Sequence, residues 1–595
     1  MQARYSDRAG TLTPPPAAPA TARCLSFAPL ATFPRRLAIC ALMAWLLYFP
    51  GLGRPALWEP DEGRYAEIAR EMVQRADYVT PRNDWVRYFE KPPLIYWITA
   101  GAVRLLGPGE LAVRLPDALF SVGQVVVTEA IGEAMFGPVA GLWAALALGL
   151  SPLFFGYARF ATLDPGLAFF TTAAFGAFYL ALRGEAKAPS DGAARRRWAL
   201  GGALMLALGT LTKGPVALVL VGGALLLHLA VERRLSRLRS LPWLGCALVY
   251  LVVVAPWFVL AARRNPGFLA FFLLHEHLHR YLAGTEHRWG PYFPALVALA
   301  GSWPWLYFAP LAPGLLGRSE PELPLREREA IRYLLIWCCV VIGFFSLTPS
   351  KLGAYVLPAL PALALLAGRG LDRLPALGPA RARRLLYGFA ASNLALALSA
   401  GIGLAVFAGR LPPVLIKEGI LVGAGLFAGG LIAAAGTRLW PGALRRVAAG
   451  AAAAGVAIAL AGGMRARAAM APIYTCRRLA RIIKPHLKPG CLLASDRRFL
   501  QSLPFYTGWR EALVGYRGEL APFAGSPGAR ASFIADRAAM LKLWHDSSCV
   551  VLIVDRSLLA GYQKALAPHP LIIGREGPSV ALLRPPPHLD VEITD

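Results

Sequence analysis

The sequence predicts an α-helical polytopic membrane protein that ends in a small α/β domain. Hydrophobic residues make up 56% of the 595 residues, and the mean hydropathy is +0.48. Charged residues make up only 16%, against about a quarter in soluble domains. The apolar residues also recur along most of the chain in blocks suited to membrane-spanning helices. This pattern excludes a disordered chain, collagen, a disulfide scaffold and a single-span receptor.

The N-terminal segment 1–36 is rich in Pro, Ala and Arg and is interpreted as a disordered cytoplasmic leader. The apolar run 37–50 follows it without a small-residue cleavage site. We therefore expect a retained first span rather than a removed signal peptide. Arg35 and Arg36 precede the run and favour a start on the inside of the membrane.

Twelve further spans are expected within the transmembrane domain, 37–463. The apolar stretch 92–106 is too short for a span, and counting it places later loops on the wrong sides. We interpret it as an interfacial helix within the first outer loop, 51–113. The spans are expected at about 114–134, 139–157, 165–183, 198–211, 215–231, 242–261, 292–316, 332–347, 355–370, 385–408, 418–435 and 447–463.

Loop charges support this count, because a basic surplus marks cytoplasmic loops. The chain has 62 basic and 35 acidic residues, a net charge of +27. In a soluble protein this surplus would indicate nucleic-acid binding, but here it collects in loops. The Arg-rich loops assigned inside are 183–197, 232–239, 369–384 and 438–446. The loop 318–332 balances four Arg with four Glu, and 129–138 carries acids only. Thirteen spans from an inside start put the C-terminus in the periplasm.

From about residue 464 the composition is that of a soluble α/β domain, 464–595. The expected elements are a helix at 474–484 ended by Pro485, a helix at 532–545, a buried strand at 549–555 and a hairpin at 571–583 turning at 576–577. Cys476, Cys491 and Cys549 could form one disulfide in an oxidising space, with one cysteine left over. No chemistry is expected in this domain.

The first outer loop contains the motif WEPDEGRYAEIAREM, Trp58–Met72. In a helix Asp61, Arg64 and Tyr65 share one face, which suits a polar site. The alternative is a structural one, in which Asp61 and Glu62 satisfy the free N–H groups and the dipole of a helix N-terminus.

The same loop ends in RNDWVRYFEKPPLIYW, Arg82–Trp97. Tyr88, Glu90 and Lys91 precede two prolines that stiffen the backbone. A lysine held at the membrane face can bind the phosphate of a lipid-linked substrate. A snorkelling lysine at a helix end is the alternative.

Three other polar positions lie at span ends. Asp164, in ARFATLDPGLAFF, is costly beside an apolar span unless it is paired or solvated, so it is a functional candidate; a helix N-cap before Pro165 is the alternative. Lys351 and Tyr355, in SKLGAYVLP, and Lys213, in TKGP, either face the site or anchor the membrane interface.

The stretch FFLLHEHLHRYLAG, Phe271–Gly284, combines metal-binding and phosphate-binding residue types. His275 and His279 are spaced to share one metal ion on a helix, but such a site needs a third ligand, for which Glu90 is a candidate. Arg280 offers a planar fork for phosphate oxygens, or it simply pairs with Glu276.

Together the motifs W-E-P-D-E-x-R-Y, F-E-K-P-P-L-x-Y-W, R-F-A-T-L-D-P, T-K-G-P and S-K-L-x-x-Y-x-L-P resemble those of the polyprenyl-phosphate-dependent glycosyltransferases of the GT-C class, the protein O-mannosyltransferase-like superfamily. Within it the sequence is most similar to the bacterial lipid A 4-amino-4-deoxy-L-arabinose transferases. The resemblance covers about 37–370 and continues more loosely in RRFLQSLPFYTG at 497–508. The motifs are specific for the superfamily and less specific for the sugar.

The resemblance implies 13 spans, a periplasmic C-terminal domain in the bacterial inner membrane, and a monomer. It implies undecaprenyl phosphate carrying aminoarabinose as the donor, lipid A phosphate as the acceptor, no nucleotide cofactor, and resistance to polymyxin. By resemblance Asp61 and Asp164 are catalytic, Lys91 and Arg280 bind the lipid phosphate, and Tyr65, Tyr88 and Tyr355 line the cavity. Glu90 and His275 match a metal-associated pair, with Zn²⁺ as the expected ion. Arg64, Lys213 and Lys351 complete the expected substrate-binding set.

Three alternatives stay open at this stage. A related transferase could move mannose to a protein hydroxyl, with Asp61 as the general base. A transporter is disfavoured because the polar motifs gather on one side and no inverted repeat is visible. A structural scaffold would not need so many polar outer motifs.

Overall fold

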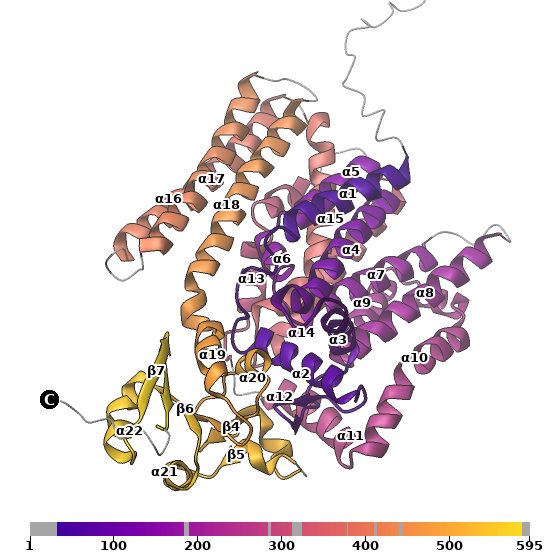
Figure 1. The fold of residues 1–595 in the computed structure, drawn as a ribbon. Coiled ribbons are helices and arrows are strands. Elements are labelled where there is room, and N and C mark those ends of the chain that lie inside the picture. The colour runs from indigo at the N-terminus through magenta and orange to yellow at the C-terminus, as the bar shows by residue number, and fades with distance from the viewer. Residues whose placement is uncertain are drawn as a thin grey trace, which may run out of the picture.

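The computed structural model describes residues 32–183, 190–283, 287–311, 324–377, 379–407, 409, 413–439, 444–526 and 528–585. Residues 1–31, the greater part of the expected leader, lie outside this range. A large bundle of helices forms one part of the molecule, and a sheet with its own short helices forms the other (Figure 1). The expected class, a polytopic helical protein with a C-terminal α/β domain, is confirmed.

Each of the 13 expected spans overlaps a helix or two consecutive helices. They are α1 (Phe33–Tyr48), α4 (Glu110–Phe136), α5 (Pro138–Gly149) with α6 (Pro152–Tyr157), α7 (Asp164–Leu182), α8 (Ser190–Lys213), α9 (Val216–Val231), α10 (Trp243–Arg264), α13 (Phe293–Gly301) with η4 (Trp305–Leu311), α14 (Leu325–Leu347), η5 (Gly353–Ala359) with α15 (Leu360–Arg373), α16 (Pro379–Phe407), α17 (Pro413–Leu439) and α18 (Leu444–Tyr474). Short helices η2 (Leu235–Ser240) and η6 (Leu374–Ala376) lie between them.

Length and composition allow eight of the helices in the described ranges to cross a membrane, and three further apolar helices are shorter. The chain is therefore a multi-span membrane protein, and the count of 13 stays a prediction. One of the shorter helices is α3 (Leu94–Leu106), where an interfacial helix is expected.

The acidic segment 129–138, expected as a loop, is mostly the last turns of α4, and it has a partner in the first helix. Arg36, at the start of α1, lies with its guanidinium 3.3 Å from the Glu129 carboxylate and 2.5 Å from the Glu133 carboxylate. Both acids lie near the end of α4, so α1 and α4 pack with complementary charges at one end. This pairing explains why a loop assigned inside lacks arginines of its own.

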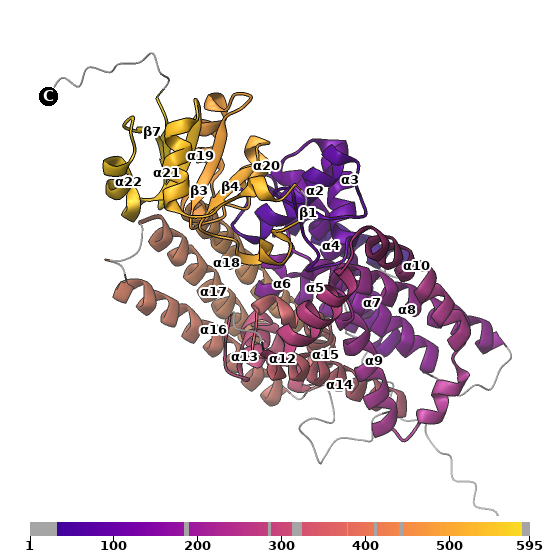
Figure 2. The ribbon, with the colours of Figure 1, turned by 90° about the horizontal axis from the view of Figure 1, so that it is seen from below.

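The first outer loop folds against the C-terminal domain (Figure 2). It contains α2 (Asp61–Arg75) and a two-residue hairpin of β1 (Arg82–Asn83) and β2 (Val86–Arg87). The Leu57 N–H donates to the Tyr506 hydroxyl at 2.8 Å, and the Asn83 amide donates to Gln501 at 2.7 Å. The buried Asp84 carboxylate accepts from the Glu511 N–H at 2.9 Å. The loop and the domain therefore lie on the same side of the helical bundle, as their shared assignment to the outside requires.

The C-terminal domain is built on a sheet whose described strands run in the order β5-β4-β3-β6-β8-β7. The first four strands in that order are parallel, and β8 and β7 continue the sheet in antiparallel fashion. The strands are β3 (Leu492–Asp496), β4 (Glu511–Val514), β5 (Phe533–Ile534), β6 (Val550–Asp555), β7 (Leu571–Glu576) and β8 (Ser579–Leu583). The helices are α19 (Arg477–Ile483), η8 (Lys484–His486), α20 (Leu503–Thr507), η9 (Gly518–Phe523), η10 (Arg530–Ser532), α21 (Arg537–Asp546), η11 (Arg556–Leu558) and α22 (Leu559–Ala565).

The strand and hairpin predictions at 549–555 and 571–583 are confirmed, but three boundaries differ. The helix α18 continues past residue 464 to Tyr474, so it connects the bundle directly to the domain. The helix expected at 474–484 begins only at Arg477. The helix expected at 532–545 begins at Arg537, because Asp536 caps it by accepting from the Ala539 N–H at 2.8 Å.

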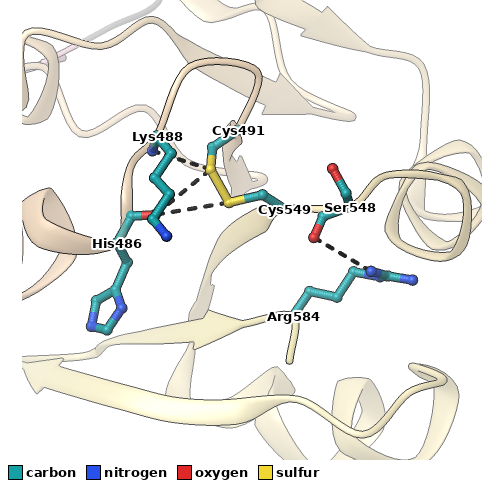
Figure 3. The surroundings of a disulfide bond; sticks show 6 residues. All are labelled: His486, Lys488, Cys491, Ser548, Cys549 and Arg584. Atoms are coloured by element: carbon teal, nitrogen blue, oxygen red, sulfur yellow. Dashed lines mark hydrogen bonds between the residues drawn. A yellow bond between two sulfur atoms is a disulfide. The ribbon is translucent and has the colours of Figure 1, made fainter. Parts of the chain in front are cut away.

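A disulfide joins Cys491 to Cys549, at the starts of the neighbouring strands β3 and β6 (Figure 3). The Lys488 N–H donates to Cys491 Sγ at 3.2 Å, and the backbone carbonyl of His486 lies 3.6 and 3.8 Å from the two sulfurs. Cys476 is the cysteine left over; it is buried, with its sulfur 3.0 Å from the Ser502 hydroxyl. The expectation of one disulfide and one spare cysteine is confirmed.

Candidate functional site

The residues predicted from separate motifs meet on the side of the bundle that faces the C-terminal domain. The first turn of α2, the segment before α3, the start of α7 and the end of α8 each contribute. The remaining contributions come from η5 and from the irregular helix formed by α11 (Phe268–Ala270), η3 (Phe271–His279) and α12 (Arg280–Ala283). The helices are apolar along most of their length and pack side by side, so the polar residues at their ends lie close together.

Asp61 and Glu62, neighbours in sequence, have different roles. The Glu62 side chain is fully buried and accepts from the Trp58 N–H at 3.0 Å, in the segment that leads into α2. The Asp61 side chain is 41% exposed, and its carboxylate lies 3.3 Å from the Arg64 guanidinium. The helix N-terminus has no side-chain cap, so the structural alternative holds only in that both acids lie in the first turn, and Asp61 is open to a substrate.

Glu62 joins four segments through its carboxylate. Arg114 in α4 donates to both of its oxygens, at 2.6 and 2.7 Å. Arg467 in α18 lies 3.2 Å away, and the Ala161 N–H donates at 3.0 Å. Glu62, the second glutamate of the W-E-P-D-E motif, thus holds the helices around Asp61 in place. The sequence motif alone did not reveal this role.

The C-terminal domain contributes a charge to the site through Glu519. Its carboxylate binds the Arg64 guanidinium twice, at 2.6 and 3.0 Å. Burial raises the pKa of Glu519, although Arg64 opposes this shift. The Arg64 guanidinium also lies 6.0 Å from the Tyr65 ring centre and 5.9 Å from that of Tyr88. No chemistry is expected in this domain, yet η9 places Glu519 against Arg64 of the first outer loop, so the domain contributes a contact to the candidate site.

Lys91 and Arg280 meet at a single carboxylate oxygen of Glu276. The Arg280 guanidinium lies 2.8 Å from Glu276 Oε1, and the Lys91 ammonium binds the same atom. Arg280 also lies 3.3 Å from Glu90. The two cations expected to bind one lipid phosphate are therefore neighbours, and two glutamates hold them in position. Lys91 and Arg64 both act electrostatically on Glu90, so this cluster adjoins the Asp61–Arg64 pair.

Asp164 and Lys213 form a second pair, with 2.5 Å between the Asp164 carboxylate and the Lys213 ammonium. The ammonium also lies 4.8 Å from the centre of the Tyr355 ring. Gly214, with φ +83°, lets the chain turn directly after Lys213, and a side chain there would collide with the His277 ring. The T-K-G-P motif thus places Lys213 at the end of α8, where Gly214 packs against His277 of η3.

Lys351 and His275 do not join these clusters. Lys351 is buried, and its ammonium donates to the backbone carbonyls of Trp289, at 3.0 Å, and Thr348. This favours a structural role. His275 is exposed, and its ring stacks on Phe271 and His279, 5.3 and 5.7 Å away between centres.

The donor set does not fit the expected metal at Glu90 and His275. Glu90 is engaged by Arg280, and His275 stacks on aromatic rings instead. No group of three or more His, Cys, Asp or Glu side chains suited to a metal occurs among the described residues. The Zn²⁺ ion therefore stays an untested prediction, and no step below depends on it.

Comparison with known proteins agrees with this geometry. Residues 35–272 match the family model described as dolichyl-phosphate-mannose-protein mannosyltransferase. The crystal structure of ArnT from Cupriavidus metallidurans bound to undecaprenyl phosphate is similar over 92% of this chain and 98% of that chain, with a TM-score of 0.76 and 27% identity. Over this part of its length the chain is similar to the GT-C, protein O-mannosyltransferase-like superfamily. The resemblance expected from the motifs is thus confirmed.

The chain is also similar to curated proteins named undecaprenyl phosphate-α-4-amino-4-deoxy-L-arabinose arabinosyl transferase. The protein from Shewanella sediminis is 33% identical over 337 residues, which are 56% of this chain and 59% of that relative. One from Pseudomonas fluorescens is 32% identical over 378 residues, 61% of this chain and 62% of that relative. The matched part thus spans about three fifths of these relatives.

Proposed function

We propose that this protein transfers 4-amino-4-deoxy-L-arabinose from undecaprenyl phosphate to a phosphate of lipid A. The proposed location is the periplasmic face of the bacterial inner membrane, with the C-terminal domain outside and a monomer as the working unit. The names of the relatives support the sugar and the carrier, and a structural neighbour binds undecaprenyl phosphate. A cationic sugar on lipid A would lower the negative surface charge and thereby give resistance to polymyxin.

The observation that carries this proposal is the meeting of Lys91 and Arg280 at Glu276, next to the Asp61–Arg64 pair. A sugar attached to a lipid phosphate needs cations for that phosphate and polar side chains for the sugar. Lys91, Arg280 and the exposed Asp61 provide such groups near the ends of helices, where a lipid-linked substrate would arrive from the membrane.

The reaction is a direct displacement at the anomeric carbon of the sugar. A phosphate oxygen of lipid A forms the new bond to C1, the bond from C1 to the carrier phosphate breaks, and the anomeric configuration inverts. Lys91 and Arg280 stabilise the negative charge that grows on the leaving phosphate. Because the acceptor phosphate is already an anion, little deprotonation is needed, and Asp61 orients the acceptor and pairs with the ammonium of the sugar.

The test is mass spectrometry of lipid A from bacteria that lack their own transferase and express this protein. The wild type should add aminoarabinose to lipid A, and Asp61→Asn should reach the membrane in normal amounts without adding any. Glu62→Gln is the matched comparison, because it should reduce the amount of folded protein instead. Unmodified lipid A with the folded wild type would reject this acceptor, and mannose on a protein from the same cells would favour the related mannosyltransferase activity.

A further inference from the structure

Three arginines lie without a carboxylate partner where the first outer loop meets the C-terminal domain. Arg82 and Arg87 lie directly opposite each other on the short hairpin of β1 and β2 (Figure 2). Arg510 belongs to the C-terminal domain and directly precedes β4. None of the three side chains forms an ion pair with a described residue. The Nε atoms of Arg82 and Arg87 are buried without a hydrogen-bond partner in the same part of the chain.

The hairpin holds two of these charges in an unfavourable arrangement. Side chains directly opposite on antiparallel strands are neighbours, so the like charges of Arg82 and Arg87 repel each other. Successive side chains of a strand point to opposite faces, and Asn83 points to the face that contacts the C-terminal domain. The Arg82 side chain therefore lies on the other face, near Arg75 at the end of α2. Burial lowers the pKa of the Arg82 guanidinium, and Arg75 and Arg87 contribute to this shift.

The nearest acids already have partners. Glu71 is almost fully buried in α2, lies 3.2 Å from the Arg75 guanidinium and accepts from the Trp85 N–H at 2.8 Å. Asp77 accepts from two backbone N–H groups of its own turn, at 3.1 and 3.2 Å, and lies 3.6 Å from Arg264. Both acids therefore leave the facing arginines of the hairpin unpaired.

Trp85, at the turn of the hairpin, brings guanidinium groups from two parts of the chain together. Asp84 and Trp85 have φ values of +53° and +67°, and a two-residue turn of this kind normally contains Asn and Gly. The guanidinium groups of Arg75 and Arg510 lie 5.4 and 5.0 Å from the centre of the Trp85 ring. Burial lowers the pKa of Arg510, and Arg75 contributes to this shift. An unfavourable backbone conformation thus places an aromatic ring between two cations, and such conformations are typical of functional sites.

The ligand that this cluster would complement is an oxyanion with more than one negative charge. Buried charges in proteins are normally paired, and guanidinium groups form strong, often bidentate bonds with phosphate oxygens. A carboxylate has one charge and two oxygens, which a single guanidinium satisfies. Three unpaired guanidinium groups that come from different segments instead suit the several oxygens and the higher charge of a phosphate group.

We propose that Arg82, Arg87 and Arg510, with Arg75 at the edge, form an anion site that binds a phosphate group. Lys91 follows Arg87 by four positions, so a phosphate bound here would stabilise the hairpin that leads to the predicted donor cation. Inorganic phosphate and the headgroup of a phosphorylated lipid share this chemistry, and the experiment below separates the two. The inference does not depend on the proposed function.

Equilibrium dialysis of the purified full-length protein in detergent, with radiolabelled inorganic phosphate at constant ionic strength, measures binding. Undecaprenyl phosphate is present throughout, so that inorganic phosphate does not compete for the proposed donor site. Arg82→Gln and Arg87→Gln should each weaken phosphate binding by about tenfold or more, because each removes a charge-assisted bond. Arg575→Gln is the control, since Arg575 is an exposed arginine on β7, and it should bind phosphate as the wild type does.

Melting curves of the same proteins separate a binding role from a structural one. Without phosphate, Arg82→Gln should melt at the temperature of the wild type or above it, because a like-charge contact across the hairpin is removed. Phosphate should raise the melting temperature of the wild type and of Arg575→Gln, since a ligand that binds only the folded state stabilises it. It should not raise that of Arg82→Gln.

Dihexanoyl phosphatidic acid, tested in the same two assays, presents the same phosphate group on a lipid. The probe with the lower dissociation constant identifies the source of the phosphate, provided that its binding is weakened in Arg82→Gln and Arg87→Gln. Binding of neither probe to the wild type would overturn the proposal. So would equal affinity in the wild type and both variants, or a lower melting temperature of Arg82→Gln in the absence of phosphate.

Discussion

Removal of Lys91 and Arg280, singly and together, tests how the site holds the lipid phosphate. Both cations contact Glu276 Oε1, Arg280 at 2.8 Å, so one phosphate placed between them would bind both. A hydrogen bond to a charged group contributes roughly 1.5–3 kcal/mol, and about 1.4 kcal/mol corresponds to a tenfold change in affinity. Lys91→Ala and Arg280→Ala should therefore each weaken the apparent donor affinity by roughly 10- to 100-fold.

The assay is the initial rate of transfer against donor concentration, with purified protein in detergent and saturating lipid A. Because the two cations share one ligand, the double variant should lose less than the sum of the single losses in free energy. Arg264→Ala is the control, since Arg264 has a 59% exposed side chain and forms a loose 3.6 Å pair with Asp77; such pairs contribute only about 0–1 kcal/mol. Additive losses, or an effect on lipid A affinity alone, would refute a shared phosphate site.

Three further outcomes are expected. Alkaline phosphatase fused after residue 595 should be active in intact cells, and an inactive fusion would mean that the span count is wrong by one. Glu519→Gln should lower the transfer rate about tenfold without lowering the amount of protein, because Arg64 would lose a charged partner worth roughly 1.5–3 kcal/mol; an unchanged rate would remove the C-terminal domain from the site. Burial raises the pKa of Glu59 to about 7, so the folded protein retains a proton that the unfolded chain loses near its ordinary pKa of 4.5. Thermal stability should therefore fall as the pH rises from about 4.5 through 7, by about 3 kcal/mol for this group, and Glu59→Gln should flatten that slope in melting curves recorded at several pH values.

Most of the helical fold could be predicted from the sequence because membrane helices carry a strong one-dimensional signal. A run of apolar residues must satisfy its backbone hydrogen bonds internally, so it forms a helix wherever it lies in lipid. The boundaries were harder to predict, as α18 shows. Its last turns contain Arg465 and Arg467, which made the segment after 464 look soluble, yet Glu418 and Glu62 pair with these arginines.

The sequence motifs named the residues that meet in the candidate site, but most of the ion pairs between them could not be predicted. Asp61 with Arg64 follows from helical spacing, and their contact at 3.3 Å agrees with it. The Asp164–Lys213 and Arg280–Glu90 pairs join residues 49 and 190 positions apart, and no local pattern reports such contacts.

Glu519 was not predicted, because it and its partner Arg64 are also far apart in the sequence. It lies in a short helix of a domain without recognisable chemistry and reaches Arg64 across 455 positions of sequence. The signal that points to it is the need of Arg64 for a second acid if the Asp61 carboxylate binds substrate. Lys351 shows that a lysine in a motif can also donate to backbone carbonyls, and its part in substrate binding stays a prediction.

The central claim is that the residues around Asp61 transfer a sugar from a polyprenyl phosphate to lipid A. The most direct measurement uses the purified protein in liposomes with undecaprenyl-phosphate aminoarabinose and lipid A, and follows both products over time. We predict that free undecaprenyl phosphate and modified lipid A appear in equal amounts with the wild type and that neither appears with Asp61→Asn. Equal product formation by the Asp61→Asn variant, or release of undecaprenyl phosphate without modification of lipid A, would contradict the account.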